Sequence, residues 1–267
     1  MQFVDIHTHL IPHWDDGAED WDVSLEMLRQ GEEDGISHVV CTPHILSKND
    51  LIREQEVTTL FEELRTRAKK AGIGTRLYLG SELYIQPDID FEREITTLAG
   101  NGRYFLIEFP MNLIPDYVAQ RFFDLVMKDK IPIIAHPERN GQIIKNPEKA
   151  FDFVERGALL QLNAGSLLGV FGSLPRTVAV QLMDANLVHV IGSDAHDLNS
   201  RPFKLRQAYE VVREKWGAER AKKLFVDNPM KIIRGQEVEP HELEPMEFEK
   251  SLTLKEKFSR FMQKIKS

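Results

Sequence analysis

Two histidines separated by one residue, His7 and His9, close an apolar run that begins at Phe3. Side chains two positions apart on a β-strand point to the same face, so both imidazoles can bind one metal ion from a single strand. Such a pair alone is weak evidence, because histidines at this spacing more often have packing or surface roles. The hypothesis of a metal site therefore depends on the ligands that the rest of the chain supplies.

Further apolar runs along the chain end in the same kinds of side chain. The residues at or just beyond these ends are His44, Glu82, Glu108, His136, Asp194 and His196. Imidazole and carboxylate ligands together suit first-row divalent ions. The sequence thus predicts a metal site that several strand ends build jointly.

The loop after His9 adds Asp15, Asp16 and Gly17. Asp-Asp-Gly is ordinary turn chemistry, so one interpretation is a simple acidic turn. The other interpretation is that the carboxylates reach back over the end of the first strand. The sequence leaves the role of His13, in the same loop, undecided.

The elements that must position these residues alternate along the chain. Strands are expected near residues 3–9, 37–42, 76–82, 104–108, 131–136, 158–163 and 187–192. Helices are expected near 21–34, 52–71, 90–99, 115–129, 147–156 and 175–185, followed by helical segments between about 203 and 235. Seven strands that alternate with helices imply parallel βαβ units, and a ring of such units is slightly smaller than the usual eight-stranded barrel. The expected fold class is α/β, a distorted TIM-like (β/α)7 barrel.

Position along the strands divides the histidines. In parallel barrels the chemistry lies at the C-terminal strand ends, where the βα loops converge. The histidines of the predicted metal site all fall there. By contrast, His38 and His189 fall near strand beginnings, so we expect them to be structural residues at the opposite mouth, and His241 in the acidic tail is expected to be solvated.

Length and charge limit the class of protein. The chain has 267 residues, 42% of them hydrophobic, and a formal net charge of -8. We expect one barrel domain over residues 1–240 and a tail over 241–267, and the acidic balance argues against a nucleic-acid partner. Ligand-bearing residues begin almost at the start, no apolar run is long enough to span a bilayer, and a single cysteine fits a reducing compartment, so a cytoplasmic location is expected.

Taken together, the motifs resemble the PHP superfamily of metallophosphoesterases, and most closely its bacterial protein-tyrosine phosphatases of capsular and exopolysaccharide operons, the CpsB/YwqE type. The resemblance runs from about residue 2 to 236 and implies the PHP form of the barrel. It rests on Asp5-Ile6-His7-Thr8-His9, Asp15-Asp16-Gly17, Thr42-Pro43-His44, Gly80-Ser81-Glu82, Ile107-Glu108-Phe109, Ala135-His136-Pro137-Glu138-Arg139 and Ser193-Asp194-Ala195-His196.

The resemblance implies up to three divalent metal ions. Manganese or iron is usual in the family; manganese is the first choice here, with iron, zinc or magnesium as the other options. Carried over residue by residue, it assigns the first ion to His7, His9, Glu82 and Asp194, the second to Glu82, Glu108 and His136, and the third to Asp16, His44 and His196. The chain departs from the family pattern at His13-Trp14, where a small residue is common at the first position, and after about residue 240.

Neighbouring metal ions can convert a bridging water into hydroxide near neutral pH and stabilise a phosphoryl group during in-line displacement. Arginine can hold the remaining phosphate oxygens in bidentate fashion. We expect Arg139 and Arg201 to do so, as similar arginines do in the family, the alternative being surface salt bridges. Asp197, next to His196, is a candidate for assisting the leaving phenolate.

A thiol mechanism is not expected. A cysteine-based tyrosine phosphatase needs an arginine six residues after its nucleophile, and the sixth residue after Cys41 is Ser47. Because Cys41 also lies within a predicted strand, we expect it to be a small buried apolar group.

The leading hypothesis is a metal-dependent protein-tyrosine phosphatase that hydrolyses phosphotyrosine with a metal-activated hydroxide. The resemblance suggests a membrane-associated tyrosine autokinase of polysaccharide synthesis or export as its substrate. The alternative within the same chemistry is a small-molecule phosphomonoesterase such as histidinol-phosphate phosphatase, which needs a more enclosed mouth. A barrel that binds metal or a partner without turnover is disfavoured by the complete ligand set, and a polymerase-associated nuclease by the acidic charge.

Residues 252–267 are expected to form a basic amphipathic helix, with apolar residues on one face and five basic side chains against one acidic side chain. One interpretation is that the apolar face packs on the barrel or on a second subunit, so an oligomer is possible. The other is peripheral contact with an anionic membrane surface.

Overall fold

The computed structural model describes residues 2–239, so the predicted helix over residues 252–267 and His241 lie outside the described residues. Within this range the strands are β1 (Phe3–Thr8), β2 (Ile36–Cys41), β3 (His44–Ile45), β4 (Arg76–Leu79), β5 (Glu82–Tyr84), β6 (Tyr104–Glu108), β7 (Ile131–Ala135), β8 (Leu159–Asn163) and β9 (Val190–Gly192). The α-helices are α1 (Trp21–Asp34), α2 (Lys48–Ile52), α3 (Glu54–Lys70), α4 (Val118–Val126), α5 (Gly141–Lys145), α6 (Glu148–Glu155), α7 (Ala164–Leu168), α8 (Ser173–Asp184), α9 (Leu205–Trp216), α10 (Ala218–Lys222) and α11 (Asn228–Ile233).

The strands form a ring in which all described pairs are parallel. One sheet has the order β1-β2-β4 and the other the order β3-β5-β6-β7-β8-β9. The strand β2 resumes as β3 after Thr42 and Pro43, and β4 resumes as β5 after Gly80 and Ser81, so these interrupted strands connect the two sheets. A parallel bridge between Thr8 and Ala195 joins the end of β9 to β1.

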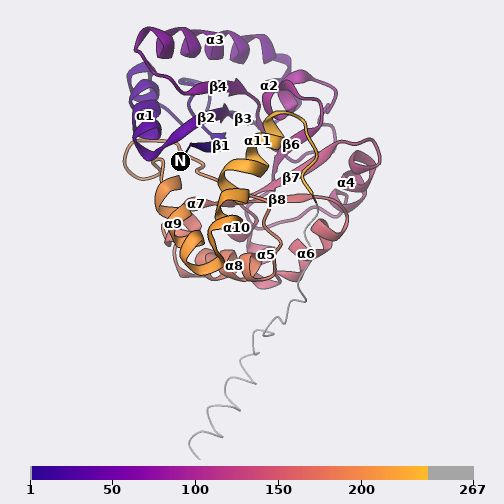
Figure 1. Cartoon of the computed structure of the whole chain (residues 1–267). Coiled ribbons are helices and arrows are strands. Elements are labelled where there is room, and N and C mark those ends of the chain that lie inside the picture. Colours follow the sequence, from indigo (N-terminus) through magenta and orange to yellow (C-terminus); the bar gives the residue numbers. More distant parts are fainter. Residues whose placement is uncertain (1, 240–267) are drawn as a thin grey trace, which may run out of the picture.

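Seven strand positions result when each interrupted strand is taken as one. The predicted distorted (β/α)7 barrel is therefore confirmed, with helices arranged around the strands (Figure 1). Pro43 has no N–H to continue the ladder, which favours the first interruption. At Gly80 a Cβ atom would lie only 3.1 Å from Leu98, so the second interruption lies where another segment packs closely against the backbone.

Two buried clusters hold the ring together. The larger one lies between strands and helices, where Phe3 packs against Tyr209 of α9 at 5.2 Å between ring centroids. The smaller one takes alternate residues of the strands together with Ile232 and Ile233 of α11, and its strand members include Val4, Ile6, Val40, Tyr104, Leu106, Ile133 and Val190. Because residues two apart on a strand share a face, this second cluster fills the inside of the ring.

The segment after α11 closes the N-terminal end of the ring. Tyr104, the first residue of β6, donates its hydroxyl hydrogen to the carbonyl oxygen of Gln236 at 2.7 Å, and the N–H of Val238 donates back to that hydroxyl at 3.1 Å. The opposite, C-terminal end is therefore the end that remains available for a site.

The prediction of a helix near residues 90–99 is wrong. Residues Glu94–Thr96 and Leu98–Gly100 form only short 3-10 turns, η1 and η2, and Ala99 has a left-handed φ of 57°. The hydroxyls of Thr96 and Thr97 donate to the carbonyl oxygens of Arg93 and Glu94, which offers the backbone an alternative to α-helical bonding.

Two features were not expected from the sequence. The helix expected over residues 52–71 is present as α3, but a further short helix, α2, precedes it and is joined to it at Arg53. Asp50 and Ser47 form a capping box that starts a separate short helix before that junction. The last helical region contains a π-helical segment, Lys223–Asp227, between α10 and α11.

Candidate metal centre

The first strand is shaped by a buried carboxylate. The register between β1 and β2 shifts by one residue between Asp5 and Thr8, which is a β-bulge. One Asp5 oxygen accepts the N–H of His7 at 3.2 Å and the N–H of Ser193 at 3.1 Å. Burial raises the pKa of this carboxyl to about 6, although the hydrogen bonds to Ser193 and His7 lower it. Asp5 therefore ties the His7 backbone to the loop that carries Asp194.

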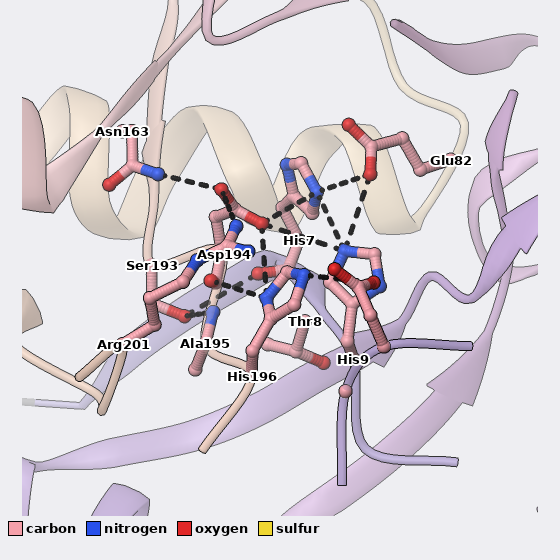
Figure 2. A network of polar contacts seen from close by, with 12 residues as sticks. His7, Thr8, His9, Glu82, Asn163, Ser193, Asp194, Ala195, His196 and Arg201 are labelled. Atoms are coloured by element: carbon pink, nitrogen blue, oxygen red, sulfur yellow. Dashed lines mark hydrogen bonds and ion pairs between the residues drawn. The ribbon is translucent and has the colours of Figure 1, made fainter. Parts of the chain in front are cut away.

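Each histidine of the β1 pair has one ring nitrogen occupied by an acceptor. His7 Nδ1 lies 2.8 Å from Gln161 Oε1, and His9 Nδ1 lies 2.9 Å from Asp15 Oδ2. These partners fix the rings with the proton on Nδ1, which leaves the lone pair on Nε2. The two Nε2 atoms lie 3.2 Å apart and face the Glu82 carboxylate (Figure 2).

The loop after β1 packs directly on His9. A Cβ atom at Gly17 would lie 2.3 Å from the carbonyl oxygen of His9, so this position must be glycine. Asp15 Oδ2 also accepts the N–H of His44 at 2.9 Å. The acidic loop therefore reaches back over the end of β1 and is more than a simple acidic turn. Asp15 links His9 to His44.

Asp194 divides its two oxygens between different partners. Its Oδ2 atom accepts hydrogen bonds from Arg139, Arg201 and Asn163. Its Oδ1 atom is buried without a hydrogen-bond partner and lies 3.4 Å from His7 Nε2. Figure 2 shows this carboxylate between Asn163 and the imidazole rings. One oxygen is thus anchored, and the other is directed into the centre with its lone pairs unused.

The predicted ligands come together in overlapping groups. Among the described residues, ligand atoms within 4.8 Å of one another are supplied by His7, His9, Glu82 and Asp194, by His9, Asp16, His44 and His196, and by His44, Glu82 and Glu108. The ninth predicted ligand, His136, has its Nε2 atom 2.9 Å from Glu82 and 3.8 Å from Glu108. All nine therefore lie in one continuous cluster at the C-terminal strand ends.

The donor set fits divalent cations. Two ligands of one ion with bond lengths of roughly 2.0–2.2 Å must lie roughly 3 Å apart, which matches the separation of His7 Nε2 and His9 Nε2. His44 Nδ1 and His196 Nε2 are buried without a hydrogen-bond partner, like Asp194 Oδ1. Unsatisfied buried polar atoms are costly, and divalent cations bound by the overlapping ligand groups would satisfy these three.

The electrostatic field of the centre also favours a positive charge. Burial lowers the pKa of the His7 ring, but Glu82 and Asp194 outweigh it and raise the pKa above its ordinary value. For Glu82 the signs are reversed. Burial raises the pKa of this carboxyl, but the neighbouring His7 and His136 outweigh burial and bring the pKa well below its ordinary value. Glu82 therefore stays ionised, and a divalent cation would be attracted to the same point. Glu108 differs, because burial and the nearby Glu82 raise its pKa.

Two of the predicted ligands have strained backbones. His136 has a φ of 31° and Asp194 a φ of 55°, both in the left-handed region that non-glycine residues rarely adopt. Each follows the last residues of a strand, β7 or β9, and the unusual φ turns its side chain toward the cluster. Strain of this kind persists where the surrounding structure enforces it and gathers at functional sites.

The predicted catalytic residues lie beside the cluster. Arg139 stacks over Phe171 at 4.3 Å while it donates to Asp194 at 2.8 Å. Asp197 accepts N–H groups of Asn199 and Arg201, so it shapes the turn that carries Arg201. Partial burial raises the pKa of Asp197, but hydrogen bonds lower it to about 2. The predicted role of Asp197 toward the leaving group stays a prediction, and its low pKa does not favour proton donation.

Sequence reasoning missed two polar residues that orient ligands. Gln161 holds His7, and the Asn163 side-chain amide donates to Asp194 at 2.8 Å. Both are fully buried on β8, within the apolar run Leu159–Asn163. Polar side chains that interrupt a buried strand at spacing two were the available signal, because they share one face of the strand.

The residues expected to have structural roles lie away from the cluster. His38 stacks on Tyr78 near the beginning of its strand. His189 is buried, and its Nδ1 atom accepts the N–H of Leu160 at 3.2 Å. Cys41 is fully buried in β2, and burial raises the pKa of its thiol. His13 is exposed and lies outside the ligand groups found among the described residues.

A family model described as "Capsular polysaccharide synthesis, CpsB/CapC" matches residues 3–234. The chain belongs to the CpsB/CapC family. The resemblance drawn from the sequence motifs is thereby confirmed, and the match extends over nearly all the residues that the structure describes.

Similar proteins of the CpsB/CapC family carry phosphatase names. The tyrosine-protein phosphatase YwqE of Bacillus subtilis is 35% identical over 241 residues, which cover 88% of this chain and 93% of that protein. The putative tyrosine-protein phosphatase CapC of Staphylococcus aureus is 39% identical over 208 residues, which cover 77% of this chain and 82% of the relative.

A solved structure supports the same relationship. It belongs to a study of YwqE from Bacillus subtilis and CpsB from Streptococcus pneumoniae, described as unique metal-dependent tyrosine phosphatases. The TM-score is 0.83 at 34% identity, with 92% of this chain and 99% of that chain covered. Among residues 2–239, no helix combines the length and the apolar character that a membrane span requires.

Proposed function

We propose that this CpsB/CapC-family chain is a metal-dependent protein-tyrosine phosphatase, a hydrolase of phosphoric monoesters. The observation that carries the proposal is the cluster of overlapping ligand groups, with three buried ligand atoms that lack hydrogen-bond partners. The names of the similar proteins support phosphotyrosine as the substrate class and do not favour the small-molecule alternative.

We assign up to three ions, with manganese as the first choice, to the nine ligands. The first ion would be held by His7, His9, Glu82 and Asp194, the second by Glu82, Glu108 and His136, and the third by Asp16, His44 and His196. When bound, such ions supply Lewis-acid stabilisation of the phosphoryl group and a nucleophilic hydroxide near neutral pH. Glu82 lies between the groups, so it would be shared by two ions.

The side chains around the ligands have separate tasks. Gln161 and Asp15 orient the rings of His7 and His9, which keeps their Nε2 lone pairs directed inward. The side chain of Asp16 is 67% exposed, so this edge of the cluster is open to an incoming phosphoprotein. An open edge suits a protein substrate better than an enclosed metabolite.

Arg139 and Arg201 would bind the phosphate oxygens that the ions leave free. Each uses one terminal nitrogen on Asp194, and their side chains remain 17% and 24% exposed. A guanidinium offers five N–H groups, so further donors are available to a substrate. Arg201 Nε in particular is buried without a hydrogen-bond partner.

The substrate class can be tested on the full-length, manganese-loaded protein. We expect rapid hydrolysis of a phosphotyrosine peptide, much slower hydrolysis of a phosphoserine peptide and slow hydrolysis of histidinol phosphate. A clear preference for histidinol phosphate would replace the proposal with the small-molecule alternative.

The arginines need a separate test. Arg139→Ala should lower kcat/KM roughly 100-fold with metal content unchanged, because a guanidinium is not a metal ligand. Arg139→Lys should recover only part of the activity, since an ammonium lacks the planar fork. A loss of metal in either variant would make Arg139 a structural residue.

We further propose a cytoplasmic location, and a membrane-associated tyrosine autokinase of polysaccharide export as the physiological substrate. We keep the division into a barrel over residues 1–240 and a tail over 241–267, and propose that the basic tail helix docks on an anionic membrane near that kinase. Truncation after about residue 245 should abolish sedimentation with anionic vesicles at low salt while peptide turnover stays unchanged.

The competing interpretation assigns the tail helix to the fold or to an oligomer. A lower melting temperature after truncation, or a change in the sedimentation coefficient from oligomer to monomer, would support it. Failure of the full-length chain to bind the vesicles would refute membrane docking.

A further inference from the structure

A cleft of about 360 Å³ borders the ligand cluster on the side of His44. Its lining includes the ligands Asp16, His44 and Glu108 and the apolar or aromatic side chains of Trp14 and Tyr84. This volume falls near the lower end of the range for small-molecule sites, which are mostly apolar with a few polar groups. The cleft thus combines a phosphate-facing edge with aromatic walls.

The Trp14 wall is held in place from two sides. Its indole Nε1 donates to the carbonyl oxygen of His44 at 2.9 Å, and the Arg53 guanidinium lies 4.7 Å from the ring centroid. Arg53 is itself held by two hydrogen bonds to Glu56, at 2.9 and 2.7 Å. A restrained ring binds a flat ligand with little loss of side-chain entropy.

The other walls lie close to ligand-bearing segments. Leu46 follows β3 directly after His44-Ile45 and is 51% exposed, so its side chain is not needed for the core. Tyr84 ends β5, pairs in register with Glu108 and stands two residues after Glu82. A phosphate held by ions at Asp16, His44 and Glu108 would therefore lie next to these walls.

We propose that this cleft binds the phenyl ring of the phosphotyrosyl side chain and that Trp14 is its specificity-determining residue. The inference rests on the proposed function. In phosphotyrosine one oxygen joins the phosphoryl group directly to the ring, so a ring must lie beside the group that the ligands hold. Aromatic rings pair favourably with aromatic walls, whereas the aliphatic linker of phosphoserine would leave the cleft unfilled.

Phosphonates separate ring binding from turnover, because their P–C bond is not hydrolysed as an ester. Calorimetry on the full-length, manganese-loaded protein should give tighter binding of phenylphosphonate than of methylphosphonate. Trp14→Ala should weaken phenylphosphonate binding roughly fivefold to tenfold, as expected for one aromatic pair, and methylphosphonate binding less than about twofold. Trp14→Phe, which keeps a ring without the N–H, should retain most of the preference.

A second set of variants covers the possibility that Trp14→Ala disturbs His44 through the lost hydrogen bond. The Leu46 side chain forms no hydrogen bond, so Leu46→Ala removes part of the cleft wall without breaking a bond to His44. It should lower the preference for the phenyl compound roughly twofold to threefold. Trp216→Ala is the matched control. This tryptophan ends α9, donates a hydrogen bond to Asp184 and does not line the cleft. It should change neither affinity.

The outcomes distinguish the cleft from the function. Equal binding of both phosphonates by the unaltered protein, or equal weakening of both by Trp14→Ala with Leu46→Ala silent, would overturn the ring site and leave the phosphatase proposal standing. Binding of neither phosphonate to the metal-loaded protein would count against the proposed function and the cleft together.

Discussion

At the C-terminal end of the strand ring, His7 and His9 each bind an acceptor through Nδ1 and direct Nε2 at carboxylates. At the N-terminal end, His189 instead accepts the backbone N–H of Leu160, and His38 stacks on Tyr78. The first pair has ring nitrogens directed at a shared point, whereas the second pair is used by the fold itself. The same residue type therefore has opposite roles at the two ends.

The two ends also differ in how they treat buried polar atoms and backbone. The N-terminal end is closed by the segment after α11, which engages the Tyr104 hydroxyl as both donor and acceptor. The C-terminal end keeps unpartnered ligand atoms and holds His136 and Asp194 at positive φ. Each of these features costs stability, so one end of the barrel is organised for packing and the other has the features of the proposed cation site.

Removing the metal should have the largest effect on this difference. Exhaustive chelation is expected to abolish phosphotyrosine hydrolysis, and manganese should restore it better than magnesium, because imidazole ligands suit the softer ion. Manganese at about 100 times its Kd should also stabilise the fold by roughly 2.7 kcal/mol. Phosphatase assays and melting curves with measured metal content check both effects, and activity in verified metal-free protein would contradict the mechanism.

Removing one predicted ligand should have the second-largest effect. Asp194→Ala should lower kcat/KM by roughly 1000-fold or more, about 4 kcal/mol of transition-state stabilisation, with reduced metal content. His38→Ala at the opposite end should leave kcat/KM within about twofold. Steady-state kinetics and metal analysis on both variants test whether the two ends are functionally distinct, and a comparable loss in His38→Ala would show that they are not.

The orienting residues should have an intermediate effect. Gln161→Leu removes the acceptor at His7 Nδ1, and we expect metal affinity to fall roughly 10-fold to 100-fold, as for other partners of metal-bound histidines. Gln181→Leu on α8 is the matched control. Competition titrations against a metal indicator measure the affinities, and equal values for the two variants would mean that His7 needs no fixed partner.

Changing the buried thiol should have the smallest effect. Burial raises the pKa of Cys41, so the thiolate needed for a nucleophile is not formed. Cys41→Ser should keep activity within about twofold while costing about 1–2 kcal/mol of folding free energy, because it buries a hydroxyl. Kinetics and denaturant unfolding check this, and an inactive variant that stays folded and metal-loaded would revive a thiol mechanism.

The sequence by itself determined the parallel ring and the gathering of the predicted ligands at one mouth. The reason is that periodicity indicates strands, and residues at the C-terminal ends of parallel strands meet at the same end of a barrel. It also separated His38 and His189 from the other histidines by position along the strands. It failed at residues 90–99, where threonine hydroxyls and a left-handed Ala99 replace a helix with short turns. Local propensity carries no information about such competing contacts.

Only the tertiary structure decided how the ligands are oriented. Gln161 on β8 holds His7, which lies 154 residues away in the sequence. Asn163 on the same strand holds Asp194, which lies 31 residues away. No local sequence pattern connects either residue to its partner. The same applies to Trp14, whose hydrogen bond to His44 depends on the loop folding back over β1. Candidate ligands can be identified from the type and position of single residues, whereas their orientation depends on packing between distant strands.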